Sequence, residues 1–362
     1  MGKLKTRRVA FALPVLAVCV AVATVSAAAF RDREAADAGA GFLVGSRENR
    51  ERLASLFALL DAPGIPPEEN FAVTREISNN LFREGEYGRL IRFLGARTLA
   101  FPEDRFNAHH LLMIAYAYTR QGSVPIAARY FDLIVKNFPD LTINGTSVHL
   151  TSLLRLIDLE SDPGRLSWYY RELISRFADY VDLGVVWFRL AQAYERMGEW
   201  AEAMRAYVNF LTLGAPDVPG FPAAAAFARR QVALNNSSRN WWTFATLPAL
   251  GAAVRHALDT NNAASLRSMQ TGVDFFTRSW SGHEDIESRI PFNIMHFMWG
   301  TRIRHADRFH ERSGADEAFL RTWGWPQVIP VWYFHFRRIH FPADPNIHGR
   351  WEWVGVYYGE SF

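Results

Sequence analysis

The chain has 362 residues, of which 40 are Lys or Arg and 37 are Asp or Glu, for a formal net charge of +3. Four of the positive charges lie in the first eight residues (Lys3, Lys5, Arg7 and Arg8), and without them +3 becomes −1. This balance excludes a strongly basic nucleic-acid-binding domain, so we expect no nucleic acid among the partners. The only cysteine is Cys19, which excludes disulfides, a thiolate nucleophile and a cysteine-ligated zinc site from the rest of the chain.

Residues 1–30 have the composition of a targeting segment. The positive start is followed by an uncharged run from Val9 to Phe30, and Val25-Ser26-Ala27 has the small-residue form of a signal-peptidase site. The run is also long enough to span a bilayer. It is therefore either a cleaved signal peptide or an uncleaved inner-membrane anchor, with lipidation at Cys19 and a twin-arginine signal as further alternatives. We expect the protein in the bacterial periplasm, free or anchored to the inner membrane, and the membrane is a partner if the segment is retained.

Residues 31–69 form a spacer with a leading helix. The first part is rich in Ala and Gly, and the pattern of residues 48–61 predicts a helix. The sequence Pro63-Gly64-Ile65-Pro66-Pro67 then breaks that helix before the next region begins.

The next region is repetitive. Gly85 and Gly122 are 37 residues apart, and Gly198 follows after twice 38. In the last repeat, two apolar stripes with helical spacing flank the glycine, and they consist of Trp187, Leu190, Ala191 and Tyr194 before it and Ala203, Tyr207 and Phe210 after it. A fixed period of this length is typical of a solenoid of helical hairpins.

This pattern resembles the tetratricopeptide repeat. A second unit fits it equally well, with Leu111, Ile114, Ala115, Tyr118, Gly122, Ala127, Phe131, Ile134 and Pro139 at the matching positions. The unit around Gly85 fits less well, and a third unit over 142–180 lacks the small residues and is divergent. The resemblance covers about residues 70–217, and a helix over 223–234 is predicted to cap the solenoid, which gives a region of 70–234.

The resemblance implies a scaffold that binds other proteins and is not an enzyme. A surface formed by the first helix of each hairpin would hold a peptide or helix of an envelope protein. We select Arg120, Gln192 and Arg196 as candidate partner-binding residues on that surface. No cofactor is expected, and the oligomeric state is left open.

After a linker at 235–240 the composition changes. Residues 241–362 hold nine of the 12 Trp and eight of the 11 His. Helical patterns are predicted at 245–258, 263–279, 293–312 and 315–323, whereas Val328–Phe341 and Trp351–Tyr358 have the β-branched and aromatic composition of strands. The fold class is thus mainly α, with an α-solenoid followed by a small aromatic-rich α+β module.

The histidines and acids of this module suggest a metal site or a hydrolase, but their spacing favours neither. His305 and His310 are five residues apart on a predicted helix and do not share a face, and His335 and His340 lie on opposite faces of a predicted strand. A cluster of His283, Glu284, Asp285 and Glu287 is the remaining acid–base candidate, and a hydrolase acting through His305, His310 and Glu284 stays a third hypothesis. We expect no metal site.

The aromatic residues of the module allow two interpretations. They either form a Trp-rich core or give a surface that binds a partner or a glycan, since Trp and Tyr are favoured at interfaces. We select Trp332, Trp351 and Trp353 as candidates for the second interpretation. It leads to an alternative function, an envelope protein that binds a ligand or glycan through its C-terminal module.

Overall fold

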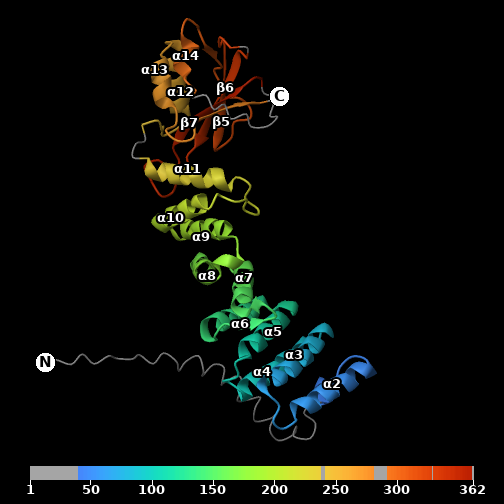
Figure 1. The fold of residues 1–362 in the computed structure, drawn as a ribbon. Coiled ribbons are helices and arrows are strands. Elements are labelled where there is room, and N and C mark those ends of the chain that lie inside the picture. Colours follow the sequence, from blue (N-terminus) through green and yellow to red (C-terminus); the bar gives the residue numbers. More distant parts are fainter. Residues whose placement is uncertain (1–39, 238–240, 281–291, 328, 361–362) are drawn as a thin grey trace, which may run out of the picture. The chain divides into compact units, whose positions relative to one another are not determined.

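A computed structural model describes residues 40–237, 241–280, 292–327 and 329–360 (Figure 1). The predicted leader with Cys19 and the acidic cluster around Glu284 lie outside these ranges. The chain divides into two compact units, Met1–Glu160 and Ser161–Phe362. Within the described ranges, no helix is both long and apolar enough to cross a bilayer.

The first unit is built from helices that each pack on the next one in the chain. A short 3-10 helix, η1, comes first, and a small hairpin of β1 and β2 precedes the last helix. The elements are η1 (Ala40–Phe42), α2 (Arg47–Leu60), α3 (Pro67–Arg83), α4 (Tyr87–Ala100), α5 (Asn107–Arg120), α6 (Val124–Asn137), β1 (Thr142–Ile143), β2 (Thr146–Ser147) and α7 (Val148–Leu159).

The second unit begins with more helices of the same kind. They are α8 (Pro163–Arg176), the 3-10 helix η2 (Ala178–Tyr180), α9 (Leu183–Met197), α10 (Trp200–Thr212) and α11 (Ala224–Asn236). The start of α8 is set locally, because Asp162 accepts a hydrogen bond from the Arg165 backbone N–H and Pro163 occupies the first turn. The boundary between the two units therefore falls inside the divergent third repeat, between its two helices.

The glycines and alanines of the repeat have the roles expected of them. Gly85, Gly122 and Gly198 have φ of +75°, +75° and +76° in the turn between the two helices of a hairpin, a conformation in which a side chain is strained. Ala191 and Ala203 are fully buried where α9 packs on α10. Small side chains there let the two helices approach closely.

The C-terminal module combines three helices with a sheet. The helices are α12 (Leu247–Asp259), α13 (Ala263–Met269) and α14 (Ile294–Met298), and the sheet has the strand order β3-β7-β6-β5-β4. The strands are β3 (Phe276–Ser279), β4 (Arg304–His305), β5 (Glu317–Trp323), β6 (Val331–Arg338) and β7 (Trp351–Tyr358). β3 pairs with β7 in parallel, and the other neighbours are antiparallel.

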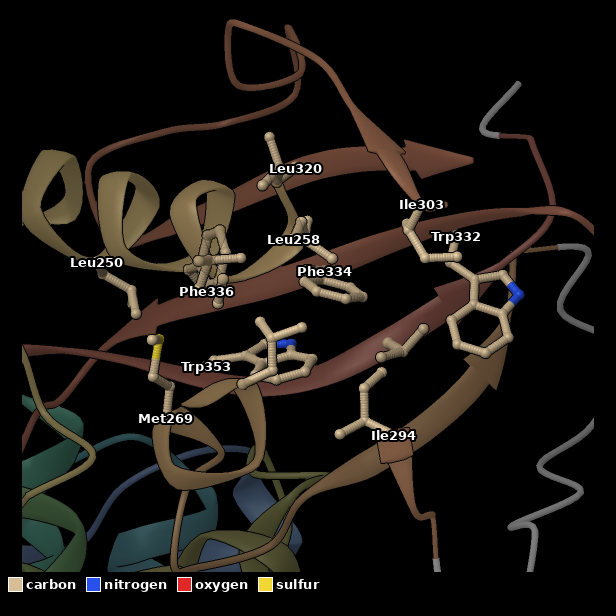
Figure 2. Close-up of a cluster of buried hydrophobic side chains, with 14 of the residues drawn as sticks. Leu250, Leu258, Met269, Ile294, Ile303, Leu320, Trp332, Phe334, Phe336 and Trp353 are labelled. Atoms are coloured by element: carbon tan, nitrogen blue, oxygen red, sulfur yellow. The ribbon is translucent and has the colours of Figure 1, made fainter. Parts of the chain in front are cut away.

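An aromatic core fills the space between these helices and one face of the sheet (Figure 2). The rings of Trp325 and Trp332 stack at 4.0 Å between centroids, and those of Phe334 and Trp353 stack at 4.3 Å. Leu250 and Leu258 of α12 close the core from the helical side.

Three of the predicted helices are wrong in whole or in part. The segment 315–323 is strand β5, the segment 263–279 is helical only to Met269 and ends in β3, and the segment 293–312 keeps a helix only at Ile294–Met298 before β4. The residues of β5 include Glu, Ala, Leu and Arg, which favour helices in isolation. Pairing with β6 along the whole of β5 overrides that preference.

The two predicted strands are confirmed as β6 and β7, and the fold class is confirmed as helical hairpins followed by an α+β module.

Helix α11 is joined to the module by a buried carboxylate. Glu352 of β7 has no exposed surface, pairs with Arg230 of α11, and accepts a hydrogen bond of 2.7 Å from the Thr271 hydroxyl. Arg337 of β6 lies 3.8 Å from the same carboxylate.

Candidate functional site

A chain of arginine–aromatic contacts crosses the first helices of the hairpins in the first unit. The guanidinium carbon of Arg120 on α5 lies 6.0 Å from the ring centroid of Phe82 on α3. That of Arg155 on α7 lies 5.9 Å from the ring centroid of Tyr116 on α5. Tyr116 and Arg120 are four residues apart and share one face of α5.

These four residues, Phe82, Tyr116, Arg120 and Arg155, define what we call the first-helix surface. Both arginines are exposed and both rings are half-buried. A cation over an aromatic face is attracted by the ring quadrupole, so each ring holds a charged group in place without neutralising it. The surface therefore presents ordered positive charge beside apolar area.

The position of Arg120 at the end of its helix also has a structural reason, which it shares with two other arginines. Arg83, Arg120 and Arg196 each stand two residues before a turn glycine, in the last turn of α3, α5 and α9. The carboxyl end of a helix carries partial negative charge, which favours a cation there. Arg155 of the first-helix surface is 3.6 Å from Asp158, so part of its charge is balanced by a neighbouring carboxylate, as that of Arg83 is by Glu76 at 3.4 Å.

A buried polar cluster lies where α3 meets the start of α5. The rings of Phe71 and Phe106 stack at 4.1 Å, and His109 meets Phe71 edge-on at 5.1 Å. Burial, with Arg75 nearby, lowers the pKa of His109 to about 4. Burial, with Arg97 and His109 nearby, lowers the pKa of His110 to about 3. Both imidazoles are therefore neutral at physiological pH and act as packing groups.

The other two residues selected on the helices lie in the second unit. Gln192 is half-buried and accepts a hydrogen bond of 3.0 Å from Arg189. Arg196 is exposed and reaches the Ser161 carbonyl at 3.5 Å. They share one face of α9, but Arg120 belongs to the first unit, so the three residues do not form one described surface.

The three selected tryptophans are core residues. Trp332 and Trp353 have no exposed surface, and Trp351 is 9% exposed. A partner or glycan cannot reach the first two rings in this structure. Trp332 stacks on Trp325 and Trp353 stacks on Phe334 (Figure 2 shows the second pair), which accounts for their presence. The interpretation as a Trp-rich core describes them.

The histidines of the module are spread over separate surroundings. His305 on β4 lies 3.1 Å from a carboxylate oxygen of Asp259, whereas His335 stacks on Phe319 at 4.6 Å and His340 lies beside His348. His310 meets the Tyr333 ring edge-on. Over the ranges that the structure describes, no three residues among His, Cys, Asp and Glu converge in a way that could hold a metal ion.

An open groove of about 660 Å³ lies on the module where the end of β6 meets the start of β5. It is lined by Asp316, Glu317, Arg337, Arg338, Ile339, His340, His348 and Gly349. Arg338 spans one side, with its backbone N–H donating to the Asp316 carbonyl and its side chain to the Gly349 carbonyl. Both acidic and basic groups line the groove.

Comparison with protein families identifies the repeats. The model of the tetratricopeptide repeat matches residues 111–141 and 186–213. The chain contains tetratricopeptide repeats. The two matches are the two units that fit the pattern best in the sequence, and they correspond to the hairpins α5–α6 and α9–α10. A search of curated proteins finds no match for the chain.

Tetratricopeptide repeats generally bind other proteins or peptides and typically carry no catalytic site, so the two matched repeats support a role as an interaction scaffold. Phe82, Tyr116 and Arg155 were not selected from the sequence. Their contacts join helices of consecutive repeats and so leave no pattern within one repeat. The only periodic signal of this surface in the sequence is the arginine two residues before each turn glycine.

Proposed function

We propose that this protein is an exported scaffold of the bacterial envelope that recognises an acidic segment of a partner protein on the first-helix surface. The observation that carries the proposal is the pair of contacts from Arg120 to Phe82 and from Arg155 to Tyr116, which orders cations on α5 and α7, the first helices of two consecutive hairpins. Tetratricopeptide repeats supply the general role of binding proteins. An acidic peptide with apolar side chains complements both parts of the surface.

Export is supported by the sequence of residues 1–30 and by the lack of cysteine beyond Cys19. An alkaline phosphatase fusion to the carboxyl end tests this part, because that enzyme is active only after export. A fusion that is inactive but stably produced would contradict it.

The partner-binding part is tested by photo-crosslinking in cells with the full chain, using a photoreactive residue in place of the exposed Thr119. We expect a specific adduct that is reduced ~10-fold or more by Arg120→Glu combined with Arg155→Glu, since reversing two charges in a polar interface repels an acidic partner. Arg129→Glu on α6 is the matched control, because Arg129 is also exposed but lies on a second helix. Equal adduct yields in all three proteins would refute this role for the surface.

Point substitutions are preferable to removal of residues 241–362. Such a truncation would leave Arg230 without its partner Glu352 and would uncover the side of α11 that packs on the module. A loss of crosslinking would then report misfolding as readily as loss of a contact.

A second candidate function is ligand binding by the C-terminal module, as the alternative drawn from the sequence suggests. The groove beside Arg338 favours it, because a volume of about 660 Å³ is in the range of small-molecule sites. Isothermal titration with soluble peptidoglycan fragments checks this candidate, with Arg338→Ala as the comparison. Absence of heat with the wild-type protein would argue against it.

A further inference from the structure

The most exposed tryptophan described in the protein stands at the end of a helix whose other side is anchored in the core. Trp299 follows α14 directly and is 91% exposed, and Met295, four residues earlier, is 42% exposed. Ile294 and Met298 of the same helix are almost fully buried in the aromatic core. The helix thus fixes Met295 and Trp299 on its outer side, and nothing in the module's core packing explains that exposure.

Arginines accompany this apolar pair. The Arg267 guanidinium of α13 lies 3.7 Å from the Met295 sulfur. Arg302, three residues after Trp299, is exposed, and its carbonyl oxygen would lie 3.1 Å from a Cβ at Gly324. The turn after β5 therefore borders the same region, and it carries Ile329, which is 42% exposed.

The described segments that form these surroundings carry no acidic residue. They are 261–273, 292–304, 323–327 and 329–332; the first two contain arginines, and none contains Asp or Glu. We call Met295, Trp299, Ile329, Arg267 and Arg302 the Trp299 patch.

We propose that the Trp299 patch docks the C-terminal module onto an anionic lipid surface. Indole rings favour the interface between water and hydrocarbon, where the ring is in contact with both. Arginines beside such a ring are attracted to anionic headgroups, and the described segments of the patch hold no carboxylate that would repel those headgroups. A small exposed apolar patch with arginines in the same segments matches a bilayer surface in both respects.

This inference goes beyond the scaffold role. It concerns α13, α14 and the turn after β5, and it requires no contact with the first-helix surface. It is also independent of the leader, because residues 1–30 could bring the chain to a membrane without the module touching it. One lipid-binding element of this kind gives weak, reversible attachment, and a second element on the same chain strengthens it.

The experiment places an environment-sensitive fluorophore at Met295. In the full chain with Cys19→Ala, the substitution Met295→Cys provides a single thiol for an NBD label, and Trp299 is kept. Vesicles of phosphatidylcholine alone and vesicles with phosphatidylglycerol are then added. With the anionic vesicles only, we expect NBD emission to shift to the blue and to rise about 2-fold or more, because the label enters the less polar membrane interface.

Two substitutions and two controls decide the origin of that signal. Trp299→Ala and Arg302→Gln should each raise the vesicle concentration for half-maximal signal ~5-fold or more, whereas Arg229→Gln, an exposed arginine of α11, should leave it unchanged. A label at Tyr180→Cys, where the native ring is 72% exposed, should not respond. Trp299 is so exposed that its replacement is not expected to affect folding.

The opposite results would overturn the proposal. An equal response of the labels at 295 and 180 would show that the leader alone brings the chain to the vesicle. A response that is the same with neutral vesicles would remove the role of the arginines. A response to increasing protein concentration without lipid would assign the patch to contact between copies of the chain.

Discussion

Glu352 is a carboxylate with no exposed surface, enclosed by groups from three elements. Arg230 comes from α11, Arg337 from β6, and the Thr271 hydroxyl from the segment after α13. Burial lowers the pKa of Arg337 to about 10, with Arg230 adding to the effect and Glu352 opposing it. The two guanidinium groups repel each other, and the Glu352 carboxylate that both approach offsets this repulsion.

Glu352→Gln should therefore destabilise the second unit strongly. Removal of one partner of a buried ion pair leaves the other charges uncompensated and typically costs about 3–5 kcal/mol. Urea unfolding followed by tryptophan fluorescence measures the change. Glu317→Gln is the control, since the Glu317 side chain is 57% exposed and its contribution should stay below about 1 kcal/mol.

The histidines at the start of α5 make the stability of the first unit depend on pH. An unfolded histidine binds a proton below its ordinary pKa of 6.5, but burial holds the pKa of His110 at about 3 in the folded protein. The unfolded state then binds more protons between these values, so the free energy of unfolding decreases as the pH falls from 6.5.

His110→Phe should reduce this dependence. Between pH 7 and pH 4.5, we expect the wild-type protein to lose about 2 kcal/mol more stability than the variant, from the value of a pKa shift in free energy. Thermal unfolding by far-UV circular dichroism at the two pH values measures the difference. Parallel pH profiles for the two proteins would mean that the folded His110 is accessible to protons.

At the scale of the helix, two glycines of the first unit have opposite requirements. Gly85 has a φ of +75° in the turn between α3 and α4, whereas Gly95 lies inside α4 with an ordinary helical φ. A Cβ at either position would meet no atom within 4 Å. Only the backbone conformation distinguishes them.

Gly85→Ala should destabilise the first unit by about 1 kcal/mol or more, because a side chain is strained at positive φ. Gly95→Ala should stabilise it by ~0.5–1 kcal/mol, since alanine has the higher helix propensity. Urea unfolding by circular dichroism gives both values. The same sign for the two substitutions would contradict the assigned turn.

The elements differ in how well the sequence predicts them. The hairpins α5–α6 and α9–α10 follow from a period of about 37 residues, since a solenoid repeats its core positions. Strand β5 could not be predicted, because its Ala and Leu favour a helix in isolation and become buried only through contact with β6 and with the helices that cover the sheet. Arg120 was found from its place in the repeat, whereas Phe82 and Arg155 join it through tertiary contacts that no single repeat contains.

At the scale of the whole chain, the boundary between the two units has a sequence explanation. It falls between α7 and α8, within the one repeat that lacks the small residues at its crossing point. Ala191 and Ala203 show what those residues do, since they are fully buried between α9 and α10. The unit that diverges most from the tetratricopeptide pattern is the one in which the chain divides.

The position of this boundary also gives the protein an intrinsic optical label. All 12 tryptophans lie at or beyond Trp168, so every one of them belongs to Ser161–Phe362. Indole emission therefore records the unfolding of that unit alone, whereas the far-ultraviolet signal records helices of both. A single sample followed in both ways shows whether the halves melt together or in succession, without any added dye.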